Sequence, residues 1–241
     1  MKGIILAAGR GSRMKSLTDD RPKCLVEFRG QPLLVWQLDA LRGAGVTEIA
    51  IVLGYRGDLL RPFRLHAFEN PRWAETQMVT SLACAADWLA SSDCIVTYAD
   101  LYYQRDAVSR LLDVDVRLGV AYDPDWLRLW TRRFADPLED AETFRIDGAS
   151  RILEIGGKPA SLAEVQGQYM GLLRFSPEAW SAVEEFRRDL DPAVRDTLQM
   201  TWLLQGLITS GFPVTGVPVP SAWGEIDSEE DLAAQSRSQT S

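Results

Sequence analysis

The sequence contains few of the residues and patterns that mark secreted, membrane-bound or thiol-dependent proteins. Only three cysteines occur in 241 residues (Cys24, Cys84 and Cys94), and their spacing fits neither a metal site nor a redox motif. Because an odd number argues against a disulfide framework, we expect them to be small buried hydrophobes in a reducing cytoplasm. The first apolar run, residues 3–8, is too short for a signal peptide, and no run reaches the length that spans a membrane.

Positive charge and histidine are also scarce. The chain has 26 Lys and Arg residues against 34 Asp and Glu residues, a formal net charge of −8. This balance gives no overall field for nucleic acid, and we expect neither a nucleic-acid nor a membrane partner. His66 is the single histidine, and no Ser/His/Asp arrangement surrounds it. The sequence therefore gives no indication of nucleophilic catalysis through a covalent enzyme intermediate.

What the chain does have is a glycine-rich loop after its first apolar run. Residues 3–8 predict a buried parallel strand, and the sequence Gly-Arg-Gly-Ser-Arg follows at residues 9–13. Glycines at the end of a strand let the backbone approach a ligand, and several N–H groups can then converge on phosphate oxygens. Arg10, Arg13 and Lys23 add positive charge. The pattern indicates a triphosphate cradle, and the plainer alternative is a glycine turn with surface arginines.

The spacing of the glycines in this loop excludes two common phosphate-binding motifs. It does not match the dinucleotide fingerprint, because Met14 stands where the third glycine belongs, and no Gly-Lys-Ser/Thr closes a P-loop. Residues 6–14 and 21–25 instead resemble the opening L-A-A-G-x-G-(S/T)-R-(M/L) and R-P-K-x-L of nucleotidyltransferases with a GT-A-like fold. The resemblance implies an α/β, Rossmann-like three-layer sandwich with a mixed, mostly parallel sheet.

The strand and helix patterns favour one continuous domain over residues 1–235. Residues 123–165 have weak periodicity and are interpreted as an insertion at the carboxyl edge of the sheet, on the acceptor side of the site. The polar residues 236–241 are expected to be a disordered tail. Strands are predicted at residues 3–8, 48–53, 64–69, 93–98, 116–121, 168–175 and 212–219, and helices at 31–43, 78–89, 107–112, 177–188, 197–210 and 228–234.

Two aspartates each follow an apolar run that predicts the end of a strand. Asp100 comes after residues 93–98, and Asp227 ends the sequence Trp-Gly-Glu-Ile-Asp. A triphosphate needs Mg²⁺, which prefers one or two carboxylates together with phosphate oxygens and water. The resemblance points to Asp100 and Asp227 as the metal ligands, with Glu225 in support. The alternatives are a turn residue for Asp100 and a helix cap for Asp227.

Residues 75–82 lie on a loop that enters a predicted helix. Polar side chains there are candidates for reading the base edge of the nucleotide, and helix capping by Thr76 is the competing interpretation. The predicted nucleotide-binding set comprises Leu6, Ala7, Ala8, Gly9, Arg10, Gly11, Ser12, Arg13, Lys23, Gln77, Ser81 and Tyr98.

The carboxyl half resembles a narrower group. Residues 167–173 and 223–228 look like segments of choline-phosphate and phosphonate cytidylyltransferases. An aromatic pair, Trp126 and Trp130, would suit a quaternary ammonium, whereas arginines such as Arg133 would suit a second anionic group. Packing of the tryptophans in the core is the competing interpretation. We favour a phosphonate or another small non-choline acceptor, and the candidate acceptor residues are Trp126, Trp130, Arg128, Arg132, Glu142 and Tyr169.

The resulting hypothesis is a Mg²⁺-dependent enzyme that transfers CMP from CTP to a small phosphate- or phosphonate-bearing acceptor and releases pyrophosphate. Arg13 and the loop amides would hold the β- and γ-phosphates, Lys23 would meet charge on the α-phosphate, and Asp100 and Asp227 would place the metal. The alternatives are a sugar-1-phosphate nucleotidyltransferase using UTP, dTTP or GTP, a non-catalytic nucleotide-binding relative, and a GT-A glycosyltransferase. A glycosyltransferase would be expected to keep an Asp-x-Asp motif, which is absent after residue 98. A homodimer is a further candidate feature.

Overall fold

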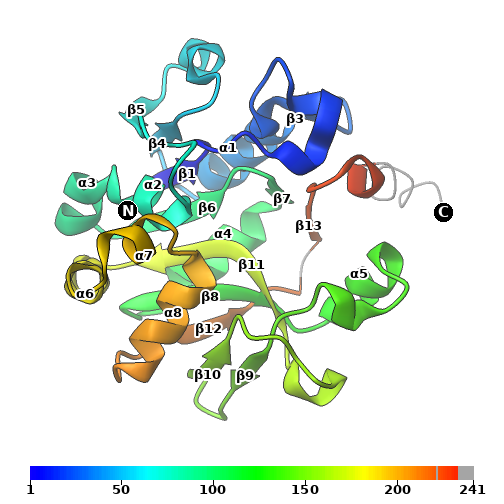
Figure 1. The fold of residues 1–241 in the computed structure, drawn as a ribbon, viewed down its shortest axis with the longest axis vertical. Coiled ribbons are helices and arrows are strands. Elements are labelled where there is room, and N and C mark those ends of the chain that lie inside the picture. The colour runs from blue at the N-terminus through cyan, green and yellow to red at the C-terminus, as the bar shows by residue number, and fades with distance from the viewer. Residues whose placement is uncertain (221, 233–241) are drawn as a thin grey trace.

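A mixed seven-stranded sheet lies at the centre of the computed structural model, which describes residues 1–220 and 222–232 (Figure 1). The strand order across the sheet is β12-β8-β11-β6-β1-β4-β5. Strand β11 runs antiparallel to both of its neighbours, and the other pairs are parallel. The strands are β1 (Lys2–Leu6), β4 (Glu48–Leu53), β5 (His66–Glu69), β6 (Cys94–Tyr98), β8 (Leu118–Asp123), β11 (Gln168–Phe175) and β12 (Thr215–Pro218).

Helices cover both faces of this sheet. Alternate residues of a strand point to opposite faces, so Ile5 packs in one core and Ile4 in the other. The core that contains Ile5 is covered by α1 (Leu33–Gly43) and α4 (Arg105–Asp113). The opposite core is covered by α2 (Met78–Ala83), α3 (Ala86–Ser91), α6 (Pro177–Arg188) and α8 (Met200–Thr209). The expected three-layer α/β sandwich with a mostly parallel sheet is confirmed.

Short elements fill the connections between these layers. Residues 123–165 form α5 (Trp126–Arg133) and a hairpin of β9 (Phe144–Ile146) and β10 (Ile152–Ile155). Two further antiparallel ribbons were not predicted: β2 (Glu27–Phe28) with β3 (Gln31–Pro32), and β7 (Leu101–Tyr103) with β13 (Trp223–Glu225). Single-turn and short 3-10 helices occupy Ser12–Thr18, Lys23–Leu25, Gly57–Phe63, Pro137–Glu139 and Leu162–Glu164, and α7 spans Pro192–Asp196.

One predicted helix is divided in the structure, and another begins later than expected. The helix expected over residues 78–89 is interrupted by a turn at Cys84 and Ala85, although Leu82 and Leu89 still face the same core. The helix expected over 197–210 begins only at Met200. Apolar periodicity survives a single turn between two short helices, so it cannot locate such a break.

Thr76 does not cap α2, so that interpretation is wrong. The residue at the cap position is Gln77, and it makes no side-chain capping bond. The Thr76 hydroxyl instead donates to the carbonyl of Arg72 at 2.9 Å and accepts from the Asn70 amide at 3.0 Å. Thr76 therefore stabilises the loop before the helix.

The end of the chain is described only in part. Residues 229–232 are helical, whereas the rest of the helix expected over 228–234 and the tail expected at 236–241 lie outside the described residues. None of the helices within 1–220 and 222–232 combines the length and apolar composition that a membrane span requires.

Candidate active site

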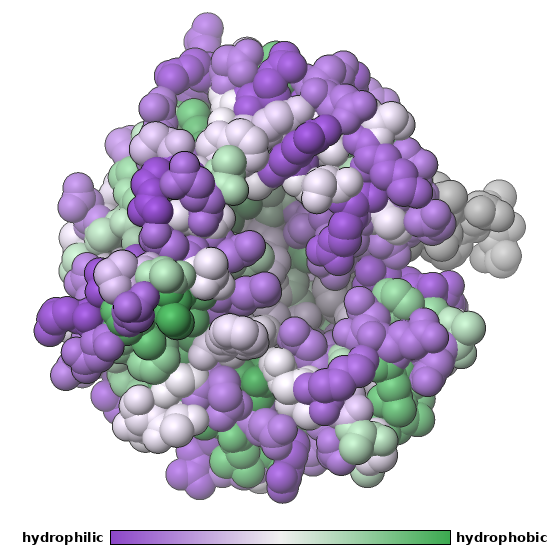
Figure 2. Space-filling view, viewed as in Figure 1, coloured by the Kyte–Doolittle hydropathy of each residue, from purple (hydrophilic) through white to green (hydrophobic). Residues whose placement is uncertain are grey.

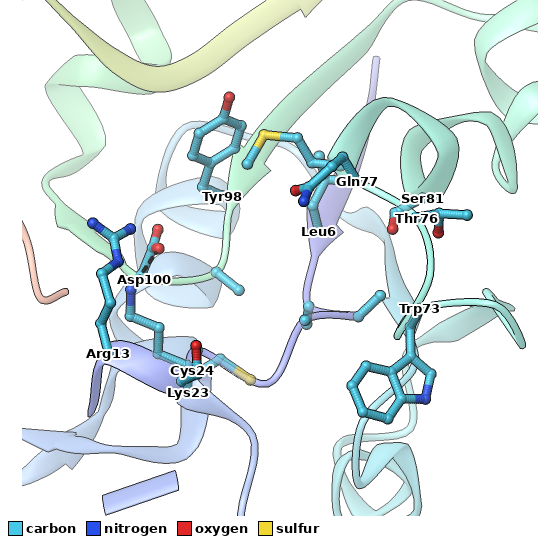
Figure 3. Close-up of a pocket in the computed structure, with 17 residues that line it drawn as sticks. Leu6, Arg13, Lys23, Cys24, Trp73, Thr76, Gln77, Ser81, Tyr98 and Asp100 are labelled. Atoms are coloured by element: carbon cyan, nitrogen blue, oxygen red, sulfur yellow. Dashed lines mark hydrogen bonds and ion pairs between the residues drawn. The ribbon is translucent and has the colours of Figure 1, made fainter. Parts of the chain in front are cut away.

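A cavity of about 430 Å³ opens at the carboxyl end of β1. Figure 2 shows that the face viewed in Figure 1 is hollowed near its middle. In Figure 3, Arg13, Lys23 and Asp100 lie on one side of the cavity, and Trp73, Thr76 and Ser81 lie on the other. Eleven of the residues predicted to bind nucleotide line it: Leu6, Ala7, Ala8, Gly9, Gly11, Ser12, Arg13, Lys23, Gln77, Ser81 and Tyr98. Arg10 does not, because its guanidinium pairs with Asp19 at 2.8 Å and lies over the Tyr55 ring.

Glycine is required at two positions beside this cavity. Gly11 has φ +70°, and a Cβ atom there would lie 2.8 Å from Cδ of Lys23. At Gly54, a Cβ atom would lie 2.4 Å from the carbonyl oxygen of Ala8. Any larger residue would therefore push either the Lys23 side chain or the strand end out of place.

Lys23 is the centre of the charged side of the cavity. Its ammonium nitrogen lies 2.8 Å from Oδ2 of Asp100 and also contacts Oδ1 of Asp227. Arg13 reaches the other oxygen of Asp227 at 2.8 Å. Lys23 is 7% exposed, so these contacts form in a largely water-excluded place where charge interactions are strong.

The β7–β13 ribbon brings the two aspartates together. Asp100 directly precedes β7, and Asp227 follows β13 by two residues. In the antiparallel register Leu101 lies opposite Glu225, and the Ile226 N–H donates to the Asp100 carbonyl at 3.0 Å. Asp227 was expected at the end of a strand of the sheet, whereas it lies two residues beyond β13 and reaches Asp100 through this separate ribbon.

Burial and neighbouring charges change the protonation equilibria of the cluster. Burial alone would lower the pKa of the Lys23 ammonium, but Asp100, Asp227 and Glu225 together raise it. Burial would raise the pKa of Asp227, but Lys23 and Arg13 hold it below its ordinary value. Burial, with the carboxylates of Asp227 and Asp100, raises the pKa of Glu225 well above its ordinary value. Lys23 is thus held as a cation and Asp227 as an anion.

The acidic cluster fits a divalent cation. Carboxylate oxygens of Asp100, Glu225 and Asp227 lie within 4.8 Å of one another. Oδ1 of Asp100 is buried and has no hydrogen-bond partner within residues 1–220 and 222–232. Leaving a buried carboxylate oxygen unpaired is costly, and hard divalent cations take oxygen ligands of this kind. Among residues 1–220 and 222–232, these three form the group that could hold a metal.

A second cavity of about 300 Å³ adjoins the first, and Arg13, Met78, Tyr98 and Asp100 line both. Its outer wall contains two acids, Asp140 and Glu142, and two aromatic residues, Trp130 and Tyr169. The Gln168 amide donates to the Glu142 carbonyl at 2.9 Å and so fixes the backbone there. Burial, with a smaller contribution from Asp140, raises the pKa of Glu142. This wall is acidic and aromatic.

The faces of α5 explain which predicted acceptor residues reach the second cavity. Trp126 and Trp130 lie one turn apart on the buried face, but only Trp130 lines the cavity. The Trp126 indole donates to the Val165 carbonyl at 3.1 Å in the core. Arg128 and Arg132 lie on the opposite, exposed face and line neither cavity.

The side chain of Arg133 is buried and contacts the loop that carries Asp227. Its Nε lies 2.8 Å from Asp231, and its Nη1 lies 3.7 Å from Glu225. Asp231 in turn accepts from the backbone N–H groups of Asp227 and Ser228 at 3.2 and 3.1 Å. The arginine therefore fixes the loop that carries the acids, and its guanidinium is already engaged by Asp231 and packed against the rings of Trp130 and Phe134.

The chain is similar to proteins of known family. Residues 3–165 match the family model of the MobA-like NTP transferase domain. The chain belongs to this family. It is 37% identical to a CTP:phosphoglutamine cytidylyltransferase of Campylobacter jejuni, over 98% of this chain and 99% of that protein. The resemblance to nucleotidyltransferases and cytidylyltransferases inferred from the sequence is thereby confirmed.

Solved structures share the fold of this NTP transferase. A CTP:phosphocholine cytidylyltransferase from Streptococcus pneumoniae superposes with a TM-score of 0.70 at 21% identity, covering 98% of this chain and 97% of that one. An inositol-1-phosphate CTP transferase from T. maritima gives 0.75 at 20% identity, covering 99% and 95%.

Several residues of this NTP transferase site were not anticipated. Gln37 is fully buried in α1, and its amide donates to the carbonyls of Tyr98 and Leu101, at 2.9 and 2.8 Å, on either side of Asp100. A polar residue within the apolar stripe of a helix was the available signal for it. Trp73 and Asp140 line the cavities from irregular segments, where no periodic pattern marks a residue as inward-facing.

Proposed function

We propose that this NTP transferase is a Mg²⁺-dependent cytidylyltransferase whose acceptor carries a phosphate or phosphonate and an amino or ammonium group. The observation that carries the proposal is the junction of the two cavities, where Lys23, Asp100 and Asp227 meet. A nucleotide in the first cavity and an acceptor in the second would present their reacting phosphates to these charges.

CTP is the favoured nucleotide because of the relatives. The full-length similarity to a CTP:phosphoglutamine cytidylyltransferase supports it, as does 29% identity to a choline-phosphate cytidylyltransferase from Streptococcus pneumoniae over 64% of this chain and 67% of that protein. A glucose-1-phosphate thymidylyltransferase of Streptomyces griseus is 25% identical over 98% of this chain, but only 65% of that protein is covered.

The proposed reaction is an in-line substitution at the α-phosphorus of CTP. An acceptor phosphate or phosphonate oxygen forms the new P–O bond, the bond between the α-phosphorus and the bridging oxygen breaks, and pyrophosphate leaves with the electron pair. Backbone amides at Gly11 and the Arg13 guanidinium hold the β- and γ-phosphates. Lys23 meets the charge that gathers on the α-phosphate. A divalent cation held by Asp100, Asp227 and Glu225 would neutralise phosphate charge.

The acidic wall of the second cavity decides the expected charge of the acceptor. Asp140 and Glu142 attract a cationic group, and the aromatic side chains of Trp130 and Tyr169, which also line the cavity, suit an ammonium. Arg128 and Arg132, which would bind a second anion, lie outside the cavity. We therefore place the amino or ammonium group against Glu142 and the reacting phosphate near Lys23.

The free cysteines, of which Cys24 and Cys94 are buried, are consistent with the cytoplasmic location expected from the sequence, and that location remains part of the proposal. The homodimer also stays a prediction.

Pyrophosphate release across a panel of substrates tests this function. The nucleotides are ATP, CTP, GTP, UTP and dTTP, and the acceptors are phosphocholine, 2-aminoethylphosphonate, phosphoglutamine and glucose-1-phosphate. We expect turnover with CTP and at least one amino- or ammonium-bearing acceptor, and its loss in Asp100→Asn. Turnover with UTP or dTTP and glucose-1-phosphate would instead identify a sugar nucleotidyltransferase. Absence of turnover and of CTP binding would contradict the proposal.

A further inference from the structure

One short segment of the chain lines the second cavity and contacts the wall of the first. Residues 195–201, here called the bridging segment, connect the end of α7 to the first turn of α8. Gln199, Met200 and Thr201 line the second cavity. The preceding residues, Arg195 and Asp196, lie against residues 72–80, which form the wall of the first cavity opposite Lys23.

Asp196 holds this wall through two kinds of contact. Its backbone carbonyl accepts from the Gln77 N–H at 2.7 Å. Its carboxylate accepts hydrogen bonds from both terminal nitrogens of Arg72, with Nη1 lying 3.3 Å from Oδ1. A bidentate ion pair of this kind fixes the orientation of both side chains as well as their distance. A third bond, from the Thr80 hydroxyl to the Arg195 carbonyl at 3.3 Å, lies one turn further along α2.

The inner side of the same wall is fixed independently of Asp196. The buried Asn70 amide donates to the hydroxyls of Thr76 and Ser81, each at 3.0 Å. The Asp196 carboxylate is instead partly exposed, with 26% of its side chain open to solvent and 53% for Arg72. Exposed ion pairs add little to the free energy of unfolding, so the Arg72–Asp196 pair is suited to setting position and not to holding the fold together.

The far end of the bridging segment touches Gly156, next to a residue that is hydrogen-bonded to the loop that carries Glu142. Gly156 has φ +83°, and a Cβ atom there would lie 2.6 Å from Cβ of Thr201. These two segments of the chain are therefore in close contact. The next residue, Gly157, donates its N–H to the Thr143 hydroxyl at 2.9 Å, directly beside Glu142. Movement of the segment at Thr201 would therefore displace the backbone beside Glu142.

We propose that the bridging segment couples the two cavities and that Asp196 is a positioning residue for the nucleotide. An acceptor bound against Gln199 and Thr201 fixes the segment, and Asp196 then fixes Gln77 and Arg72 around the nucleotide. The inference rests on the proposed function, in which one cavity takes CTP and the other the acceptor. Because such coupling is reciprocal, CTP must strengthen acceptor binding by the same factor.

Titration calorimetry with the unreactive analogue α,β-methylene-CTP and Mg²⁺ tests the coupling. Its Kd is measured with and without saturating phosphocholine, and again with 2-aminoethylphosphonate. For the wild type we expect at least one acceptor to lower the Kd about 5-fold or more. In Asp196→Ala and Arg72→Ala this factor should fall towards one, and Asp196→Glu should restore part of it.

A matched control separates positioning from loss of a surface charge. Glu69→Ala breaks an exposed ion pair with Arg61, 2.8 Å long, that lies outside both cavities, and it should keep the full acceptor effect. The thermal midpoints of all variants should lie close to that of the wild type. If the wild type binds the analogue but neither acceptor changes its Kd, or if Asp196→Ala keeps the change, the coupling is wrong and the proposed function stands. If the wild type does not bind the analogue at all, both are wrong.

Discussion

At the scale of single residues, Lys23 determines how charge is arranged between the two cavities. It contacts Asp100 and Asp227 at once, and Gly11 leaves room for its side chain. The Arg-Pro-Lys motif indicated a phosphate-binding lysine. The motif could not reveal that the same ammonium lies between two acids, because their approach depends on a contact between segments more than a hundred residues apart.

Replacing Lys23 should affect turnover more than nucleotide binding. We expect Lys23→Ala to lower kcat by about 10²–10³, because an organised charge that stabilises the transition state is lost. Lys23→Arg should also be impaired, since a planar guanidinium does not fit where a compact ammonium contacts two carboxylates. The measurement is kcat together with the Kd of CTP. Near-normal kcat in Lys23→Ala would rule out this role.

Replacing Glu142 with glutamine should raise the thermal stability of the protein and weaken acceptor binding. Burial raises the pKa of this carboxyl above its ordinary value of 4.5, so the native state binds its proton more tightly than the unfolded state. The free energy of unfolding therefore falls as pH rises from about 4.5 through the raised pKa. Glu142→Gln removes this loss, and its Tm should exceed that of the wild type by of order 2 °C at neutral pH and by little below pH 4.5.

The same variant should have a higher KM for the acceptor, because the charge facing the ammonium is gone. Glu184→Gln, on the exposed face of α6, is the control and should change neither quantity. A Glu142→Gln enzyme with an unchanged acceptor KM would remove Glu142 from the acceptor site.

At the scale of elements, α5 shows that the face of a helix decides which of the residues predicted from sequence can reach a site. Its interleaved tryptophans and arginines suggested two competing acceptor chemistries. Once the segment is helical, Trp126, Trp130 and Arg133 share the buried face, while Arg128 and Arg132 share the exposed one. The weak periodicity of residues 123–165 hid this division, because the helix has only eight residues.

The two tryptophans of α5 provide a matched pair of substitutions. Each is 4% exposed, but only Trp130 lines the second cavity. Trp130→Leu should raise the acceptor KM roughly 2- to 30-fold through loss of a cation–π contact. Trp126→Leu should give a similar loss of Tm with an acceptor KM close to that of the wild type. Equal KM values in the two variants would contradict the assignment of Trp130, as would a larger effect from Arg128→Ala.

At the scale of the whole molecule, the sheet was largely predictable and its accessory ribbons were not. Strands such as Glu48–Leu53 and Gln168–Phe175 are rich in apolar residues and bounded by turn residues, and they lie where the sequence placed them. The ribbon of Leu101–Tyr103 with Trp223–Glu225 is three residues long on each side and has no pattern of its own. Its pairing depends on the finished fold, and so does the position of Asp227.

The most direct test of the account uses an acceptor whose phosphate or phosphonate oxygens carry ¹⁸O. Attack by such an oxygen on the α-phosphorus of CTP places the label in the bridge and on the acceptor side of the product, and leaves pyrophosphate unlabelled. Mass spectrometry after complete turnover measures the label in the joined product and in pyrophosphate. We predict that all of the label is found in the CMP–acceptor product. Labelled pyrophosphate, or a labelled nucleoside monophosphate in place of the joined product, would contradict the central claim that this protein transfers CMP to an acceptor oxygen.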